Sequence, residues 1–249
     1  MKPAIALQLW SIKDDCERNF DDAIKNVRDM GYDGVEFAGY YGKTADEINQ
    51  LLTDTGLGIA GSHVPYEHLR EALDETLDFE KAIGNTRVVV PFASFQTLEG
   101  WEGFANDLNR FSQSASKRGI ELYYHNHAHE FSDIENQDML SFLNKNVESL
   151  YYEVDLYWLS YAGINEFDWV DAHKEAIGLF HFKDKQVTPV ESTELGAGVL
   201  PIKKYVEKAK ELHMPWLIVE QEAFQTLTPL EAAHQNVNKL KELVEEVHQ

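Results

Sequence analysis

The sequence predicts an α/β protein that folds as a single (β/α)8 barrel. Short apolar runs of strand character recur along the chain at intervals of roughly 25 to 35 residues, which is the spacing of βα units. Eight such runs are present, and amphipathic helical patterns lie between them. Because a set of eight parallel strands closes into a barrel, this count favours the barrel fold.

The expected strands combine apolar, β-branched and aromatic residues, and they end at turn residues or at charged helical segments. In chain order they are residues 4–9, 34–37, 58–63, 88–91, 120–126, 150–155, 177–182 and 217–220. An open doubly wound sheet is the second choice. No glycine-rich phosphate loop follows the first strand, however, so the barrel is preferred.

Helices are expected between the strands, and the clearest covers residues 20–30. Its apolar residues fall on one helical face, and Gly31 follows it as glycine commonly does at a helix C-terminus. The apolar residues of that face are Phe20, Ala23, Ile24, Val27 and Met30. Similar patterns predict helices at residues 46–52, 104–117, 202–212 and 229–247.

Length and composition indicate one globular domain spanning residues 1–249. A chain of 249 residues with 43% hydrophobic residues can bury a sizeable core, and no linker rich in proline, glycine or serine divides it. We find no signal-peptide pattern and no run of about eighteen apolar residues. We therefore expect a cytoplasmic protein with no membrane partner.

The charge of the chain excludes polyanionic partners. Its formal net charge is -21, from 43 acidic and 22 basic residues, whereas a nucleic-acid-binding protein needs a basic face. Cys16 is the only cysteine, which excludes an intrachain disulfide and a cysteine-rich zinc site. Acidic neighbours are expected to raise the pKa of the Cys16 thiol, so this residue is not a candidate nucleophile.

Polar and ionisable residues gather where the expected strands end. The segment 124–131 carries three histidines and Glu130 directly after a buried strand. In a parallel barrel the carboxyl ends of the strands form the functional rim. Half of the ten histidines fall at such ends: His63, His125, His127, His129 and His181.

Three further strands end in groups that can bind a metal. Because side chains alternate along a strand, Glu153 shares a face with Asp155, His181 with Lys183, and Glu220 with Glu222. Buried carboxylates are costly unless a cation neutralises them. Carboxylates with one imidazole suit Mn, Mg or Co better than a structural zinc, although zinc remains an alternative. The other interpretation is a polar cluster in which these acids pair with Lys183 and no metal binds.

Five segments together resemble the sugar phosphate isomerase/epimerase-like family. That family belongs to the xylose isomerase-like TIM barrel superfamily, with inosose dehydratases, ketose 3-epimerases and hydroxypyruvate isomerases. The resemblance covers most of the chain in order, and it implies a TIM barrel. The segments are residues 8–11 (Gln-Leu-Trp-Ser), 125–131, 155–158 (Asp-Leu-Tyr-Trp), 181–184 (His-Phe-Lys-Asp) and 219–222 (Val-Glu-Gln-Glu).

The resemblance implies metal ligands at Asp155, His181 and Glu220. Epimerases of the superfamily carry a ligating Glu at the end of the fifth strand, where this chain has His125. Either His125 binds the metal or Glu130 folds back from the following loop, and we favour Glu130. The resemblance also implies substrate binding by residues near three strand ends: Gln8, His63 and Trp158.

In these relatives a divalent metal holds adjacent oxygens of a sugar while an acid or histidine removes a proton beside the carbonyl. The resemblance therefore implies an isomerase or epimerase that works through an enediolate. A dehydratase or lyase of a keto-cyclitol or 3-keto sugar is the alternative. His127 and His125 are the candidates for the general base and acid. Lys183 is expected to bind a substrate oxygen or to act as a counter-ion, and Glu222 stands where relatives carry Asp.

The substrate is expected to be an unphosphorylated keto sugar, cyclitol or polyol. All six arginines lie on expected helices or at strand starts, so no phosphate clamp is available at the rim. Four aromatic residues near the strand ends can form a wall beside a sugar ring, although packing in the core or at the rim is the commoner fate of such residues: Trp10, Phe92, Trp158 and Phe224. The loop at residues 186–200 is a candidate lid because it carries Gly196 and Gly198.

Two rival interpretations share the same fold. A metal-dependent endonuclease needs a basic rim, which the charge of -21 argues against. A non-catalytic sugar-binding barrel stays open, although the ligand residues are intact. Homo-oligomers are also compatible with the sequence.

Overall fold

The computed structural model describes residues 2–249, and its strand order is that of a closed parallel barrel. This order, β1-β10-β7-β6-β5-β4-β3-β2, confirms the predicted (β/α)8 fold. The strands are β1 (Ala4–Gln8), β2 (Gly34–Phe37), β3 (Gly58–His63), β4 (Arg87–Val90), β5 (Glu121–His125), β6 (Leu150–Asp155), β7 (Ile177–Phe182) and β10 (Trp216–Val219). Each predicted strand is present, with bounds that differ by at most one residue at either end.

The chain divides into two compact units, which are described separately. Unit 1 comprises the residues up to Ala60 together with Leu179–Gln249, and unit 2 comprises Gly61–Gly178. The assignment of residues 1–249 to one domain stays a prediction.

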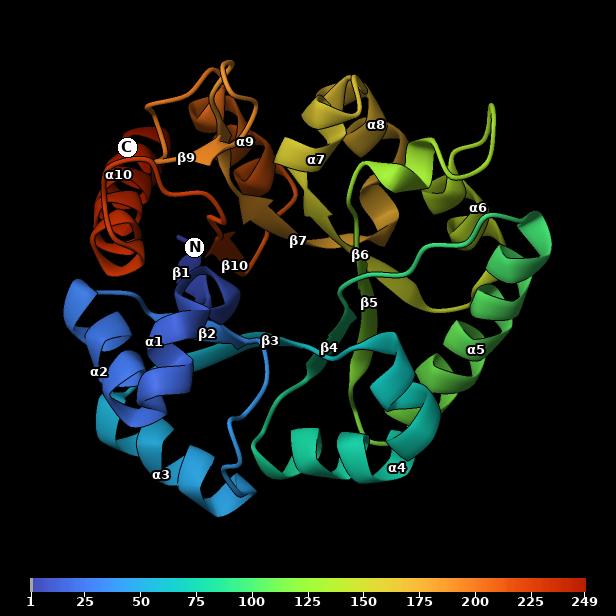
Figure 1. Cartoon of the computed structure of the whole chain (residues 1–249), viewed down its shortest axis with the longest axis horizontal. Coiled ribbons are helices and arrows are strands. Elements are labelled where there is room, and N and C mark those ends of the chain that lie inside the picture. Colours follow the sequence, from blue (N-terminus) through green and yellow to red (C-terminus); the bar gives the residue numbers. More distant parts are fainter. Residues whose placement is uncertain (1) are drawn as a thin grey trace. The chain divides into compact units, whose positions relative to one another are not determined.

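In unit 1, β1 lies between its two parallel partners, β2 and β10, so the N-terminal strand pairs with the last strand of the barrel (Figure 1). β10 also pairs with β7. Two short strands, β8 (Asp184–Lys185) and β9 (Ser192–Thr193), form a separate antiparallel ladder. The helical segments of this unit are η1 (Leu9–Ile12), α1 (Lys13–Arg18), α2 (Phe20–Met30), α3 (Ala45–Thr55), α9 (Ile202–Glu211) and α10 (Pro229–His248).

Helix α2 follows the sequence prediction closely. Its N-cap Asn19 accepts a hydrogen bond from the Asp22 N–H, and Gly31 ends it in the left-handed conformation with φ 94°. The predicted apolar face is buried at Phe20, Ala23, Ile24 and Val27.

Unit 2 contains the parallel strands β3, β4, β5 and β6, paired in that order. Its core is rich in aromatic rings: Phe104 and Phe111 on α5 are buried beside the Tyr66 ring of α4, and Trp101 is buried beside Phe104. Figure 1 shows α4 and α5 on the outside of these strands. The helical segments are α4 (Tyr66–Ala82), α5 (Leu98–Ser116), η2 (His129–Phe131), α6 (Met139–Asn146), α7 (Leu156–Tyr161), α8 (Glu166–His173) and η3 (Lys174–Ala176).

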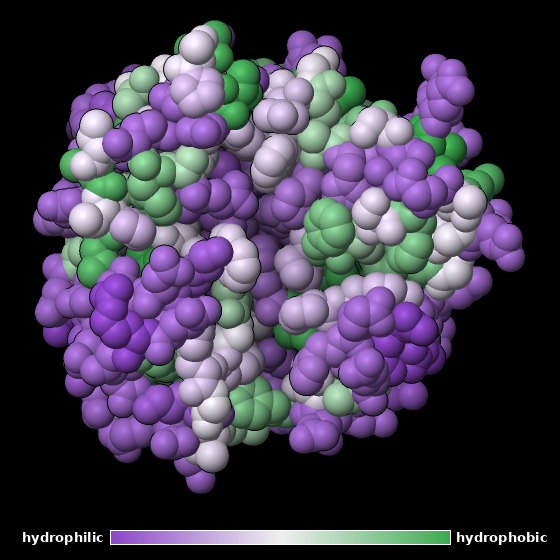
Figure 2. Space-filling view, in the orientation of Figure 1, coloured by the Kyte–Doolittle hydropathy of each residue, from purple (hydrophilic) through white to green (hydrophobic). Residues whose placement is uncertain are grey.

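Hydrophilic residues cover most of the face shown in Figure 2, as the formal charge of -21 leads one to expect. None of the helices within residues 2–249 combines the length and the apolar character needed to cross a membrane.

Cys16 lies on α1 and its side chain is buried. Burial, and next the nearby Asp15 charge, raise the pKa of the Cys16 thiol to about 12. The acidic neighbours in the sequence had predicted the direction of this shift. Burial, its larger cause, was not apparent because the surrounding residues are polar.

Alkylation of Cys16 is expected to be very slow in the folded protein and to accelerate as pH rises. With a thiol pKa of about 12, only about 10⁻⁴ of the thiol is ionised at pH 8. Iodoacetamide labelling followed by mass spectrometry measures the rate, with the urea-unfolded chain as the control. Labelling of the folded protein at the rate of the unfolded chain contradicts the burial of this thiol.

Candidate functional site

In unit 1, His181 on β7 lies between two acidic side chains. Its Nε2 is 2.8 Å from Glu36 Oε2, and its Nδ1 is 3.1 Å from Glu220 Oε2. All three side chains are buried. Gln8, at the end of β1, donates from Nε2 to Glu36 Oε2 at 2.6 Å, so β1 and β2 together orient this carboxylate.

Lys183 lies two residues beyond His181 and is held by two carboxylates. Its Nζ is 2.7 Å from Glu220 Oε2 and 3.1 Å from Glu222 Oε2. The Lys183 side chain is buried, whereas the Glu222 side chain is 32% exposed and so remains accessible to a small molecule. We call Glu36, His181, Lys183, Glu220 and Glu222 the β7 group. This arrangement agrees with the predicted pairing of Lys183 with nearby acids.

The segment after Lys183 is organised by one buried carboxylate. Asp184 accepts hydrogen bonds from four backbone N–H groups, those of Lys185, Gly196, Gly198 and Leu200, at 2.7 to 3.1 Å. Hydrogen bonds from N–H groups to an ionised carboxylate are stronger than those between neutral groups. Three of these N–H groups, those of Gly196, Gly198 and Leu200, belong to the loop at residues 186–200, the candidate lid, and attach its C-terminal end to Asp184.

Gly198→Ala is expected to lower the free energy of unfolding by about 1–3 kcal/mol, the usual range for an overpacked site. A Cβ at Gly198 would collide with Asp184 Oδ1 and lie 2.5 Å from the Lys185 carbonyl oxygen. Urea denaturation measures the change. The matched control is Gly103→Ala on α5, where nothing lies within 4 Å of the added Cβ. If both variants unfold at the same urea concentration, the chain around Asp184 has room for a methyl group at residue 198.

In unit 2, the carboxyl ends of β3, β5 and β6 bring together two histidines and two acids. His125 Nε2 lies 3.6 Å from Asp155 Oδ2, and His63 Nε2 lies 2.7 Å from Glu153 Oε2. The His63 and His125 rings are adjacent, with centroids 5.2 Å apart. We call His63, His125, Glu153 and Asp155 the β6 group. As the alternation of side chains predicted, Glu153 and Asp155 are both buried.

Asp155 also starts helix α7. Its Oδ1 accepts hydrogen bonds from the N–H groups of Tyr157 and Trp158, at 2.8 and 3.2 Å. The N-cap therefore uses one carboxylate oxygen, while Oδ2 is the atom near His125. Asp155 therefore caps α7 with Oδ1 and faces His125 with Oδ2.

Glu130 lies with His127 and His129, not with His125 and Asp155. Both of its oxygens accept the His127 N–H, at 3.1 and 3.0 Å, and Oε1 also accepts the Tyr124 hydroxyl at 2.8 Å. Burial raises the pKa of the Glu130 carboxyl. Its contacts are those of a residue that fixes the loop after β5.

Aromatic rings surround His127 in unit 2. Its ring centroid is 5.2 Å from that of Trp158 and 5.4 Å from that of Phe92, which is exposed. Phe92 and Trp158 therefore both lie beside His127, and their use as a wall for a sugar ring stays a prediction. In unit 1, Trp10 is also exposed, and the Lys13 ammonium lies over its ring.

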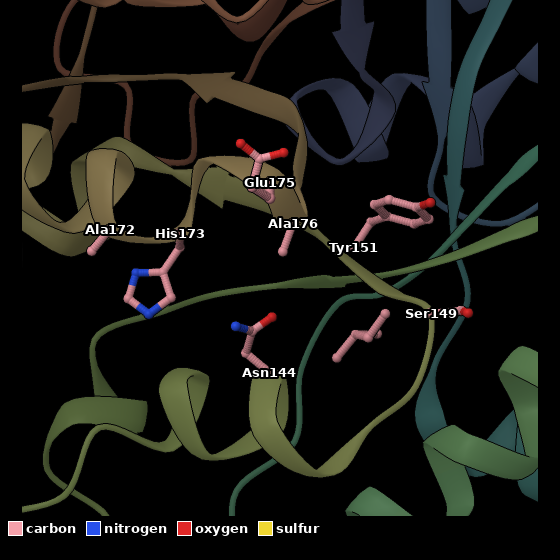
Figure 3. Close-up of a pocket in the computed structure, with 8 residues that line it drawn as sticks. Asn144, Ser149, Tyr151, Ala172, His173, Glu175 and Ala176 are labelled. Carbon is pink, nitrogen blue, oxygen red and sulfur yellow. The ribbon is translucent and has the colours of Figure 1, made fainter.

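A cavity of about 480 Å³ lies elsewhere in unit 2. Ser149, Tyr151 and His173 are among the residues that line it (Figure 3). The lining residue Leu150 is the first residue of β6, whereas Asp155 is the last residue of that strand. The His173 ring at this cavity stacks on Trp169, and its Nε2 contacts the Ser141 hydroxyl at 2.9 Å. The cavity is therefore separate from the β6 group.

The arginines lie where the sequence placed them, away from the strand carboxyl ends. Arg87 is the first residue of β4, Arg118 follows α5, and the other four are on helices. Several pair with acids on their own or adjacent helices, as Arg118 does with Asp74 and Asp78. No arginine belongs to the β7 group or the β6 group.

Sequence reasoning did not identify Glu36 or the role of Asp184. Glu36 is the single acid in the short strand Gly-Val-Glu-Phe, and an acid in a strand that is otherwise apolar was the available signal. Asp184 was visible in the segment His-Phe-Lys-Asp, but its partners are backbone N–H groups of a later loop, which leave no mark in the sequence.

Each group contains one imidazole and one carboxylate whose donor atoms lie close enough together to bind the same divalent cation. Two ligand atoms that bind one ion at about 2.1 Å and at right angles lie about 3 Å apart. The 3.1 Å between His181 Nδ1 and Glu220 Oε2 matches this separation. His125 and Asp155 offer ligand atoms within 4.8 Å of each other. Carboxylate and imidazole donors of this kind suit several divalent metals.

Comparison with known proteins agrees with this fold. The sequence model of the xylose isomerase-like TIM barrel family matches residues 24–243. Inosose dehydratase from Mesomycoplasma hyopneumoniae strain J is 25% identical over 294 residues, covering 98% of this chain and 96% of that protein. Inosose dehydratase from Clostridium botulinum strain Alaska E43 is 24% identical over 194 residues, spanning 68% of this chain and 64% of that protein.

Solved structures show the same fold at low sequence identity. A sugar phosphate isomerase/epimerase from Parabacteroides distasonis ATCC 8503 has a TM-score of 0.84 at 20% identity and covers 97% of this chain and 98% of its own. The IOLI protein with a binding zinc atom has a TM-score of 0.80 at 15% identity, with 99% of each chain covered.

Proposed function

The chain belongs to the xylose isomerase-like TIM barrel family, and on that basis we propose that it is a divalent-metal-dependent isomerase or epimerase of a keto sugar or related polyol. The observation that carries the proposal is the set of buried acids and histidines at strand carboxyl ends, with Asp155, His181 and Glu220 among them. Buried charges of this kind are seldom kept for stability alone.

The proposed metal ligands are Asp155, His181 and Glu220, with His125 from the fifth strand. Strand carboxyl ends meet at one rim in barrels of this class, and this general rule supports assigning the four residues to one ion. We favoured Glu130 over His125 from the sequence. The contacts of Glu130 with the His127 N–H and the Tyr124 hydroxyl support the opposite choice.

A divalent ion bound there would act as a Lewis acid that stabilises negative charge on substrate oxygens. Manganese is our first choice, with magnesium, cobalt or zinc as alternatives, and zinc draws support from the IOLI protein. The protein itself supplies the groups that move and hold protons. His127, whose ring is partly exposed beside Trp158, is the proposed base at the carbon next to the carbonyl.

Lys183 is proposed to donate a hydrogen bond to the substrate carbonyl oxygen as negative charge develops there. Glu220 and Glu222 orient its ammonium group at 2.7 and 3.1 Å. Glu222, which is partly exposed, is proposed to return the proton to the substrate. Gln8, His63 and Trp158 are proposed to bind substrate hydroxyl groups or the ring face.

The proposed substrate carries no phosphate. The β7 and β6 groups contain five acids, namely Glu36, Glu153, Asp155, Glu220 and Glu222, and Lys183 is the one lysine in them. A phosphate dianion among these acids would meet like charge without an arginine clamp. A neutral keto sugar or cyclitol avoids this repulsion.

A dehydratase acting on a keto-cyclitol is the second candidate function. It is favoured by the inosose dehydratases to which the chain is similar, one of them over 98% of this chain. Dehydration begins with the same removal of a proton beside a carbonyl, followed by loss of hydroxide. Location in the cytoplasm and assembly into homo-oligomers stay predictions.

The test is a screen of ketopentoses, ketohexoses and an inosose in D₂O, with Mn²⁺ or Co²⁺ added, followed by ¹H NMR. Deuterium at one carbon with recovery of an isomer or epimer supports the first function, and loss of water from the inosose supports the second. Chelation with EDTA is expected to abolish either reaction, and Mn²⁺ to restore it. Reaction that persists after complete removal of divalent metal contradicts both functions. Binding of a probe without reaction favours the sugar-binding barrel.

A further inference from the structure

The chain that follows β10 is fixed to the β8–β9 ladder by one hydroxyl group. Ser192 Oγ accepts hydrogen bonds from the N–H groups of Glu222 and Ala223, at 3.0 and 2.9 Å. Ser192 is buried, and it pairs with Lys185 across the ladder. The backbone of Glu222 is therefore set by a residue thirty positions earlier in the chain.

Further contacts lock the same segment on both sides of Glu222. Before it, Gln221 donates its backbone N–H to Ser11 Oγ at 3.0 Å, and its side-chain oxygen accepts from Asn236 Nδ2 at 2.8 Å. After it, Gln225 Nε2 donates to the Ser192 carbonyl at 3.1 Å. The segment has little freedom to move relative to β9.

The ladder itself is held by Asp184. Its carboxylate accepts N–H groups from both ends of the loop, with Lys185 at the start and Gly196, Gly198 and Leu200 at the end. The Val199 N–H adds a bond to the Lys185 carbonyl at 2.9 Å. Since Asp184 directly follows Lys183, one short stretch of chain carries both the ammonium group and the anchor of the loop.

We propose that Ser192 is a positioning residue, which places the Glu222 carboxylate against Lys183 on a loop that Asp184 keeps rigid. The inference rests on the proposed function of Lys183 and Glu222. Holding a proton-transferring group within a fraction of an ångström of its working position is a general requirement of catalysis. The loop at residues 186–200 acts as a fixed wall that orients the site before substrate arrives.

The first test measures backbone protection, which needs no substrate. In native-state hydrogen exchange followed by NMR, Ser192→Ala is expected to speed exchange of the Glu222 and Ala223 amides about 10-fold or more, because both lose their acceptor. Ser192→Thr, which keeps a hydroxyl, is expected to restore protection. Thr193→Val is the matched control, since the Thr193 hydroxyl donates to Glu194 instead. Unchanged exchange in Ser192→Ala overturns the proposal.

The second test is a double-mutant cycle on the probe that reacts in the D₂O screen. Ser192→Ala is expected to lower kcat about 10–100-fold with little change in KM, the usual effect of losing an orienting partner. In a Glu222→Gln background, Ser192→Ala is expected to have no further effect on kcat. If the two losses multiply instead, Ser192 acts through general stability and the positioning role is wrong.

The cycle separates failure of this inference from failure of the proposed function. If Glu222→Gln keeps full activity, the proposed proton return by Glu222 is wrong, whatever Ser192 does. If Glu222→Gln loses activity while Ser192→Ala keeps it, the function stands and the positioning role is wrong. Asp184→Asn is expected to reproduce the kcat loss of Ser192→Ala. It is also expected to speed exchange at the Gly196, Gly198 and Leu200 amides, since an amide side chain has one acceptor oxygen.

Discussion

Asp155→Asn is expected to remove bound metal and to lower activity by at least about 10²–10³-fold, the usual cost of losing one electrostatic group at a reacting centre. The fold is expected to survive. Asparagine is as good an N-cap as aspartate, so its Oδ1 can still accept the Tyr157 and Trp158 N–H groups that start α7. The substitution thus removes the charge near His125 and retains the cap.

Mass spectrometry measures the metal content of the variant, and thermal unfolding measures its stability. Asp155→Ala is the informative companion, because it removes the cap as well and is expected to cost a further ~1 kcal/mol of stability. Glu130→Gln is the matched control at a buried carboxylate whose oxygens bind the His127 N–H. Full metal content in Asp155→Asn contradicts Asp155 as a metal ligand. Metal loss in Glu130→Gln reverses our choice between His125 and Glu130.

Lys183→Met is expected to reduce both stability and activity. The ammonium lies 2.7 Å from Glu220 and 3.1 Å from Glu222 in a buried position, and its removal leaves these acids without their cation. Breaking a buried ion pair in this way typically costs about 3–5 kcal/mol. Loss of the hydrogen bond to the developing oxyanion is expected to lower kcat by about 10²–10³-fold.

Urea denaturation of the metal-free protein measures the stability effect, since bound metal would add its own contribution. Lys239→Met is the control, because Lys239 also lies 3.1 Å from a carboxylate, that of Glu242, but on the surface. The urea midpoint of Lys239→Met is expected to change little, because surface ion pairs contribute little to stability. If the urea midpoint falls by the same amount in both variants, the buried ion pairs of Lys183 contribute no more to stability than a surface pair does.

The strands could be predicted from the sequence because each is a short apolar run whose residues are buried, as in Arg87–Val90 and Trp216–Val219. The positions of Asp155, His181 and Glu220 at or beside strand termini could also be predicted, whereas their shared function stays a proposal. Helix α7 was not expected. Its sequence, Leu-Tyr-Trp-Leu-Ser-Tyr, is apolar around most of its surface and shows no amphipathic pattern.

Contacts that depend on the backbone escaped prediction. The side chain of Asp184 meets N–H groups that any residue supplies, and Ser192 does the same for the chain after β10. The local contacts of Glu130 could not be foreseen for a related reason. Glu130 accepts hydrogen bonds from the His127 N–H and from the hydroxyl of Tyr124 on β5. Residue types alone do not show that such nearby groups use the carboxylate oxygens.

Ala4 on β1 pairs with Trp216 on β10, so two segments that are made far apart in time on the ribosome must meet in the folded chain. Unit 2 is one uninterrupted stretch, Gly61–Gly178, so all of its residues are available for pairing once that stretch has been made. Strand β1 is made first, yet its β10 partner emerges almost last. Until β10 has been made, the edge of β1 that pairs with it lacks that partner, and an unpaired strand edge can associate with other chains.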